Sequence, residues 1–152
     1  MDISALALEI LQQEQERAPG RQLRWRIAPG LQTQADGRLA RVALENLLGN
    51  AVKYTRDQPQ ALIELDPLPG PAGGPGHFVL QDNGAGFDMA HAGKLFKPFQ
   101  RLHSPSSGFD GTGIGLATVR RILERHGGGI CAQAMPGQGA RFAFSFLSLI
   151  HI

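Results

Sequence analysis

The sequence predicts an α/β sandwich, in which a mixed β-sheet is covered on one face by about three helices. Two observations predict this class. Three segments repeat apolar residues at helical spacing, and five shorter segments show strand-like patterns. In order, the chain reads helix, strand, helix, two strands, helix and two strands, a succession typical of helices packed on a sheet.

The first half of the chain predicts two helices with a strand between them. Apolar residues at helical spacing indicate a helix over residues 2–17, which a Pro-Gly pair at positions 19 and 20 ends. Residues 23–27 alternate apolar and arginine side chains, as a half-buried strand does. A second helix is expected from the capping residue Asp36 to Thr55.

The second half predicts four strands, one further long helix and one short helix. Residues 61–66 and 77–82 have strand patterns. The Pro- and Gly-rich stretch 67–76 is interpreted as their connection rather than as an interdomain linker, because motifs on both sides of it belong to one site. Residues 83–112 hold many glycines, so a mostly irregular segment with one short helix is expected there. The remaining elements are a helix from residues 113–115 to 126 and strands at residues 130–134 and 141–146.

Length and composition limit the function classes. The 152 residues are 42% hydrophobic and 18% charged, which indicates one globular domain over residues 1–152 and excludes disorder. The net charge of +2 is too small to indicate a nucleic-acid partner, and no apolar stretch reaches the roughly 18–20 residues of a membrane span. The single cysteine, Cys131, excludes an internal disulfide and is expected to be a small buried hydrophobe. We therefore expect a cytoplasmic domain with no direct membrane insertion.

Three polar side chains share one face of the second helix. Asn46, Asn50 and Lys53 follow one another at i, i+4 and i+7 and therefore stack along that face. An amide oxygen is a suitable ligand for Mg²⁺, and a lysine supplies a point charge for phosphate. The pattern predicts either a metal–phosphate site or an ordinary solvated helix face.

Two glycine-rich segments allow a close approach between backbone and ligand. Asp82 ends a strand and is followed by Gly84 and Gly86, which places a carboxylate acceptor beside accessible backbone; a plain turn is the alternative. Residues 111–116, Gly-Thr-Gly-Ile-Gly-Leu, lead into the third helix and predict an anion site at its N-terminus, with a flexible loop as the alternative. They match neither a dinucleotide-binding fingerprint nor a Walker A loop.

Taken in order, these segments resemble the ATP-binding catalytic domain of bacterial sensor histidine kinases, a family within the gyrase, Hsp90, histidine kinase and MutL superfamily. Residues 46–55 resemble its asparagine box, residues 82–87 its first glycine box and residues 111–116 its second. Residues 95–101, Leu-Phe-Lys-Pro-Phe-Gln-Arg, resemble its phenylalanine box. The resemblance extends from residue 36 to residue 146 and departs at Ala140, where a Thr is usual.

The resemblance implies a Bergerat-type fold that binds ATP with Mg²⁺ between the second helix and a mobile lid at residues 96–112. It makes Asn50 the Mg²⁺ ligand, Asn46 a support for the phosphate end and Lys53 a phosphate contact. It also implies that Asp82 accepts the N6 amino group of adenine, which excludes guanine. Tyr54 either flanks the base or ribose or belongs partly to the core, and Arg101 either reaches the γ-phosphate or is solvated. The other implied nucleotide contacts are Gly84, Gly86, Phe96, Phe99, Gly111, Thr112, Gly113, Gly115 and Leu116.

The resemblance also implies partners. The family transfers the γ-phosphoryl group of ATP to a histidine on a dimerisation domain of the same parent protein, with a response regulator downstream. None of the five histidines here shows the family's acceptor pattern or a metal-ligand spacing, so each is expected at the surface or in a loop. The chain is therefore interpreted as a catalytic domain excised from a longer sensor kinase, and membrane anchoring of that parent is compatible with this. The alternatives are a hydrolytic ATPase of the same superfamily, which carries Glu where Asn46 stands, and a nucleotide-binding module without catalysis.

Overall fold

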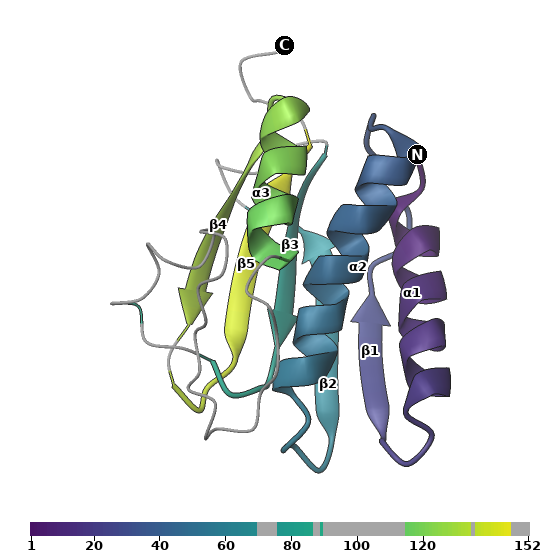
Figure 1. Ribbon diagram of the computed structural model, residues 1–152, viewed down its shortest axis with the longest axis vertical. Coiled ribbons are helices and arrows are strands. Elements are labelled where there is room, and N and C mark those ends of the chain that lie inside the picture. Colours follow the sequence, from purple (N-terminus) through teal and green to yellow (C-terminus); the bar gives the residue numbers. More distant parts are fainter. Residues whose placement is uncertain (70–75, 87–88, 90–114, 135, 147–152) are drawn as a thin grey trace.

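The computed structural model describes residues 1–69, 76–86, 89, 115–134 and 136–146, and it has three helices and five strands in them (Figure 1). Every helix and strand expected within these ranges is present, with ends within two residues of the expected ones. The short helix expected within residues 83–112 falls mostly outside them. In chain order the elements are α1 (Ile3–Arg17), β1 (Leu23–Ile27), α2 (Gly37–Tyr54), β2 (Ala61–Pro67), β3 (His77–Asp82), α3 (Gly115–Arg125), β4 (Gly129–Ala134) and β5 (Ala140–Ser145). Within the described ranges, no helix has the length and hydropathy of a membrane span.

The strands form one mixed sheet. Its order is β1-β2-β3-β5-β4, with β1 parallel to β2 and the other neighbouring pairs antiparallel. β2 and β3 lie side by side, with Leu65 opposite Leu80. The Pro- and Gly-rich stretch therefore joins two adjacent strands of one sheet, as expected.

The three helices cover one face of this sheet (Figure 1), because each turns an apolar stripe toward it. α2 buries Leu44 and Leu48 completely, and β3 buries Phe78 and Leu80 against the helices with 2% of each exposed. The ring of Phe144 on β5 lies 5.6 Å from that of Phe78 and extends the same core. The predicted α/β sandwich with a mixed sheet is confirmed.

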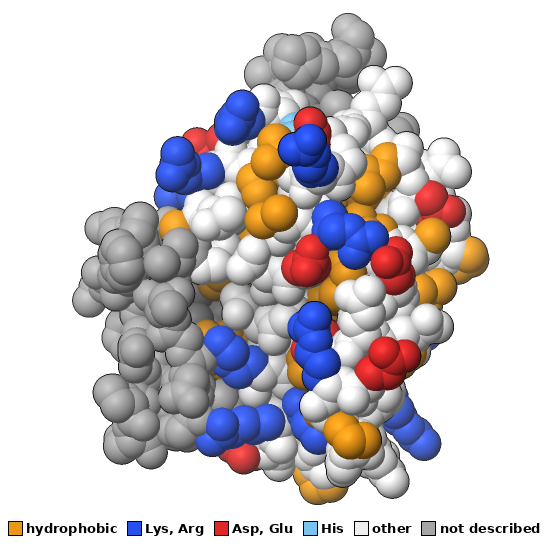
Figure 2. Space-filling view, turned by 45° about the vertical axis from the view of Figure 1, so that its right-hand side comes forward, with side chains coloured by type: hydrophobic (Ala, Val, Ile, Leu, Met, Phe, Trp, Pro, Cys, Tyr) orange, Lys and Arg blue, Asp and Glu red, His pale blue; other side chains and the backbone are white. Residues whose placement is uncertain are grey.

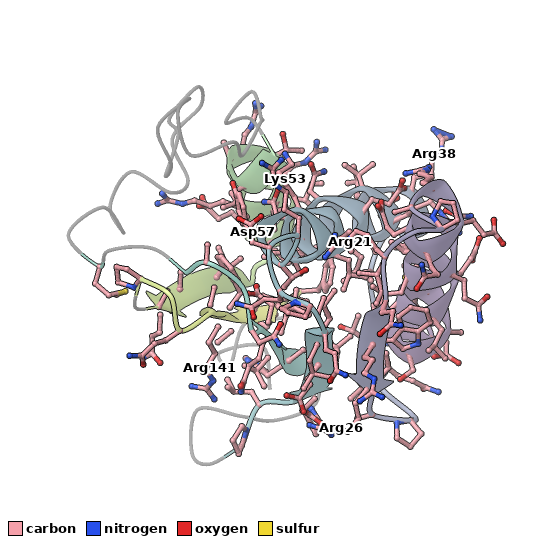
Figure 3. The ribbon with its side chains drawn as sticks, turned by 90° about the horizontal axis from the view of Figure 1, so that it is seen from below. Arg21, Arg26, Arg38, Lys53, Asp57 and Arg141 are labelled. Atoms are coloured by element: carbon pink, nitrogen blue, oxygen red, sulfur yellow. The ribbon has the colours of Figure 1, made fainter. Side chains whose placement is uncertain are left out.

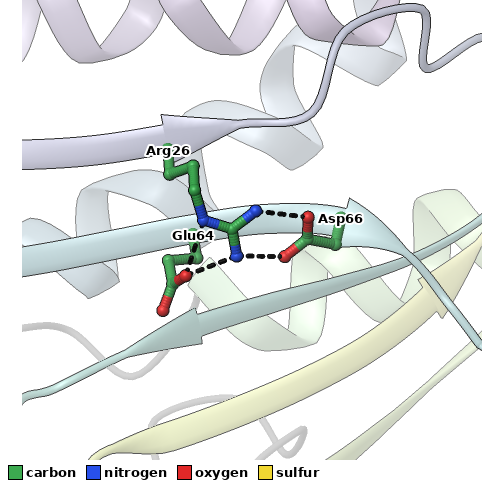
Figure 4. Close-up of polar contacts among 3 residues, drawn as sticks. All are labelled: Arg26, Glu64 and Asp66. Atoms are coloured by element: carbon green, nitrogen blue, oxygen red, sulfur yellow. Dashed lines mark hydrogen bonds and ion pairs between the residues drawn. The ribbon is translucent and has the colours of Figure 1, made fainter.

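The opposite face of the sheet carries charged and polar side chains. Arg26 on β1 donates two hydrogen bonds of 2.9 Å to the carboxylate of Asp66 on β2, and it also pairs with Glu64 (Figure 4). These contacts raise the pKa of Arg26, the hydrogen bond to Asp66 most of all. The arginine thus ties the two parallel strands together on the face that no helix covers.

Cys131 lies on this uncovered face as well, and its expected burial was wrong. The cysteine is exposed. Side chains alternate across a strand, and in the edge strand β4 the neighbours Ile130 and Ala132 take the face that packs against the core. Cys131 consequently points to the other side.

α2 and α3 are joined at the end of the molecule far from the glycine-rich turns. Asp36 caps α2 through its Oδ1, which accepts the N–H groups of Arg38 and Leu39 at 2.9 and 3.0 Å. The backbone N–H of Asp36 donates to Nε2 of His126, in the turn after α3, at 3.0 Å. Nδ1 of His126 therefore carries the proton and donates to the carbonyl of Ile122 at 2.8 Å. This histidine lies in a turn, as expected, and it fixes the position of α3 along α2.

Candidate functional site

The polar row of α2 lines one hollow. Asn46, Asn50 and Lys53 are half-buried, and together with Glu14 and Glu45 they surround a space of about 420 Å³. The Asn50 side chain has no hydrogen-bond partner within the described residues, so its amide oxygen fits a hard cation such as Mg²⁺. No group of three His, Cys, Asp or Glu side chains in the same residues could hold a metal. A Mg²⁺ ion bound by the Asn50 amide oxygen would complete its coordination with water or with oxygens of a bound ligand.

Charges on the helical side of the molecule are mixed. Basic and acidic side chains are interspersed on the face shown in Figure 2, and Arg41 of α2 pairs with Glu9 of α1 at 3.0 Å. The described residues thus form no broad basic field on that face. Among them, Lys53 in the α2 row and the N-terminus of α3 beside it would attract an anion.

The N-terminus of α3 lies directly against this row. A Cβ atom on Gly115 would lie 2.7 Å from Oδ1 of Asn46, so a larger residue at this position would displace the Asn46 amide. Nδ2 of Asn46 donates to the carbonyl of Val42 at 2.8 Å, which orients the amide so that Oδ1 faces α3. The first N–H groups of a helix lack partners and carry the positive end of its dipole. An anion bound between Asn46 and the start of α3 would therefore meet donors from α3 as well as from α2.

Asp82 lines a second hollow, of about 470 Å³, at the end of β3. Its Oδ1 accepts the N–H of Gly84 at 2.8 Å. Burial raises the pKa of Asp82 to about 6, although hydrogen bonds from the backbone N–H groups of Gly84 and Ala140 oppose the shift. The carboxylate keeps lone pairs that accept a donor from a ligand, and Gln133 and Gln138 add amide groups to the same hollow.

The two elements that carry these hollows, α2 and the turn after β3, meet at Tyr54, the last residue of α2. Its carbonyl accepts the N–H of Ala85 at 3.0 Å, and a Cβ atom on Gly84 would overlap the same carbonyl. Burial raises the pKa of the Tyr54 hydroxyl, and the negative charge of Asp82 adds to that shift. The C-terminal turn of α2 is thus packed directly on the turn that follows β3.

Two residues outside the predicted set shape the turn after Asp82. Gly139 has φ +84° and stands where a Cβ atom would overlap the carbonyl of Asp82, so only glycine fits. Asn83 ties the turn to β2, because its Oδ1 accepts the N–H of Leu62 and its Nδ2 donates to the carbonyl of Gln60, both at 2.9 Å. The Gly-x-Gly spacing at residues 137–139 was visible in the sequence, but nothing in it indicated contact with Asp82.

The structure brings only part of the predicted set together. The α2 row and Asp82 line separate hollows. The elements that carry them are in contact at Tyr54 and Gly84. Leu116 is 6% exposed and belongs to the core, and Gly86 is buried. The expected lid and the following predicted contacts lie outside the described residues: Phe96, Phe99, Arg101, Gly111, Thr112 and Gly113.

Comparison with known proteins places this geometry in context. The model of a family described as histidine kinase-, DNA gyrase B- and HSP90-like ATPase matches residues 35–150. The phosphate regulon sensor protein PhoR of Pseudomonas aeruginosa is 34% identical over 147 residues, which cover 95% of this chain and 32% of that protein. Cyanobacterial phytochrome B of Nostoc sp. is 40% identical over 100 residues, 66% of this chain and 13% of that protein. The crystal structure of full-length ShkA in complex with AMPPNP superposes with a TM-score of 0.70 at 28% identity, over 95% of this chain and 29% of ShkA. The chain thus spans a third or less of the length of these proteins.

Replacing Asp82 with Asn should flatten the pH dependence of stability. The pKa of about 6 lies above the ordinary value of 3.8, so this group favours the folded state below about pH 4 and loses that contribution as the pH rises through about 6. We expect the free energy of unfolding of the wild type to fall by about 2–3 kcal/mol, relative to the Asp82→Asn variant, between about pH 4 and 7. Urea unfolding across this range measures it, with Asp57→Asn as the exposed control. Parallel curves for the wild type and Asp82→Asn would contradict the assignment.

Gly84→Ala should destabilise the fold, whereas Gly49→Ala should not. A methyl group at residue 84 overlaps the Tyr54 carbonyl, while nothing lies within 4 Å of a Cβ atom at residue 49 in the middle of α2. We expect a loss of about 2–4 kcal/mol for Gly84→Ala from forced displacement of packed backbone, and a gain of about 0.5–1 kcal/mol for Gly49→Ala from helix propensity. Thermal and urea unfolding decide this. Equal stability of the two variants would show that the turn moves away from α2 without cost.

Proposed function

This chain belongs to the family of histidine kinase-, DNA gyrase B- and HSP90-like ATPases, and we propose that it is the ATP-binding catalytic domain of a sensor histidine kinase. One observation carries the proposal. The start of α3 meets the amide row of α2 at Asn46, and the last turn of α2 meets the turn that follows the carboxylate ending β3. Segments from distant parts of the chain are thus arranged along one helix. The AMPPNP bound by the similar protein ShkA supports ATP as the ligand.

Asp82 would recognise the base. At neutral pH a carboxyl group with a pKa of about 6 is mostly ionised and accepts the N6 amino group of adenine. Guanine presents a carbonyl at that position, which would leave a partly buried carboxylate facing another acceptor. Gly84 and Gly139 keep side chains out of the turn, so that the backbone can pass close to the base.

Asn46, Asn50, Lys53 and the N-terminus of α3 would hold the phosphates. The Asn50 amide oxygen would ligate Mg²⁺, which when bound offsets charge on the phosphate oxygens. Lys53 would donate to a phosphate oxygen. Asn46, with its oxygen turned toward Gly115, would keep the start of α3 in place beside the phosphates.

Phosphoryl transfer fits these residues better than hydrolysis. A hydrolytic member of the superfamily needs a general base near the γ-phosphate, and an amide at Asn46 cannot take a proton. We therefore favour transfer to a histidine of a dimerisation domain in the parent protein, followed by a response regulator. His126 is not the acceptor in this proposal, because both of its ring nitrogens are engaged in hydrogen bonds. We place the domain in the cytoplasm, where ATP is available.

The protein should bind ATP and discriminate against GTP, and the discrimination should depend on Asp82. We expect GTP to bind at least about tenfold more weakly, and Asp82→Asn to weaken ATP binding by about 2–3 kcal/mol, because it replaces a charged acceptor with a neutral amide. Titration calorimetry with both nucleotides in the presence of Mg²⁺ measures these affinities. Asp57→Asn, at an exposed position just after α2, serves as the control and should bind like the wild type. Equal affinity for ATP and GTP would overturn the assignment of the base end.

A further inference from the structure

The C-terminal end of α2 is capped by a side chain from outside the helix. Nη1 of Arg21, in the loop between α1 and β1, donates to the carbonyl of Val52 at 2.6 Å. Nη2 of the same guanidinium donates to Oγ1 of Thr55 at 3.2 Å. Thr55 is fully buried, and its hydroxyl lies 2.8 Å from the carbonyl of Ala51. The last carbonyls of a helix have no partner within it, so these contacts satisfy groups that the fold would otherwise leave unpaired.

The loop that carries Arg21 is itself held by α1. Nε2 of Gln15 donates to the carbonyls of Ala18 and Arg21 at 3.1 and 2.8 Å. Its Oε1 accepts the N–H of Leu23, the first residue of β1, at 3.2 Å. One glutamine side chain thus fixes the backbone on both sides of Arg21, so the guanidinium reaches α2 from a defined position.

The Arg21 guanidinium interacts with groups at the end of α2 rather than with a carboxylate. In the described ranges no carboxylate lies within ion-pair distance of this guanidinium. Burial lowers the pKa of Arg21, which indicates partial loss of solvent. A cation beside the C-terminal carbonyls also interacts favourably with the negative end of the helix dipole. Figure 3 shows Arg21 near this end of α2, with Lys53 and Asp57 around the same turn.

We infer that Arg21 is a positioning residue for adenine recognition, acting through the last turn of α2. Val52 and Thr55 flank Tyr54, whose carbonyl accepts the N–H of Ala85 and touches Gly84. Gly84 in turn donates to Asp82. Arg21 lines neither hollow, so it reaches the base only through this turn. The inference rests on the proposed function, since it assigns Asp82 to the base.

The guanidinium suits this position because it is planar and presents several donors in a fixed fork. One fork reaches a backbone carbonyl and a hydroxyl at the same time, whereas the single ammonium of lysine is a point donor. Arg21→Met keeps an apolar stem but removes both hydrogen bonds. Arg21→Lys keeps the charge and should restore part of the effect.

The test compares ligands that report on the two ends of the site. Titration calorimetry with ATP, GTP and inorganic tripolyphosphate, each with Mg²⁺, is carried out at low temperature on folded wild type, Arg21→Met and Arg21→Lys. We expect Arg21→Met to weaken ATP binding about tenfold and to reduce the preference for ATP over GTP. Binding of tripolyphosphate should weaken much less than binding of ATP, and Arg21→Lys should lie between the wild type and Arg21→Met. Arg24→Met, at an exposed arginine on β1, is the matched control and should behave like the wild type.

Each other outcome is decisive. Wild-type preference for ATP in Arg21→Met would overturn the positioning role and leave the proposed function standing. Equal losses for ATP and tripolyphosphate would mean that Arg21 only stabilises the fold, which also overturns the inference. If Arg21→Met does not fold, the test uses Arg21→Lys alone. A wild-type preference for ATP over GTP in Arg21→Lys would then contradict the role of the guanidinium. Absence of ATP preference in the wild type itself would overturn the proposed function together with the inference.

Discussion

The candidate site depends on the contact between the last turn of α2 and the turn after β3. The carbonyl of Tyr54 accepts the N–H of Ala85 at 3.0 Å, and the absence of a side chain at Gly84 allows the two backbones to touch. Asn46, Asn50 and Lys53 lie on α2, whereas Asp82 lies on the sheet. This contact therefore sets how far the amide row stands from the carboxylate. A shift of α2 along the sheet would break this contact and change the distance between the two hollows.

The same arrangement raises the pKa of the Asp82 carboxyl group. The turn and the β4–β5 hairpin bury the carboxylate and raise its pKa to about 6, because two backbone hydrogen bonds do not fully replace water. An ionised carboxylate held in this way is costly in the empty protein and accepts a ligand donor readily. On the amide row, the glycine at position 115 lets the start of α3 approach the amide of Asn46. The proposed selectivity for adenine and the proposed phosphate binding thus depend on two close backbone approaches.

Local patterns in the sequence predicted the elements but not the contacts between them. Helical and strand periodicity located all eight described elements, and helical spacing placed Asn46, Asn50 and Lys53 on one face. Cys131 was assigned to the wrong face, because Ile, Cys and Ala in an edge strand give a weak alternation. Gly139 and Arg21 were not identified as site residues. Both residues act through contacts with residues far away in the sequence: Gly139 with Asp82, and Arg21 with the end of α2. Local sequence patterns do not indicate such long-range contacts.

The most direct test of one nucleotide site with two ends is to titrate the protein with adenosine and with tripolyphosphate while recording backbone amide NMR shifts. Adenosine should shift the amides of Gly84, Ala85 and Ala140, around the carboxylate of Asp82. Tripolyphosphate with Mg²⁺ should instead shift those of Asn50 and Gly115. ATP should shift both groups. If adenosine left the turn after β3 unchanged, or if both ligands shifted the same amides, the assignment of base and phosphate ends would be contradicted.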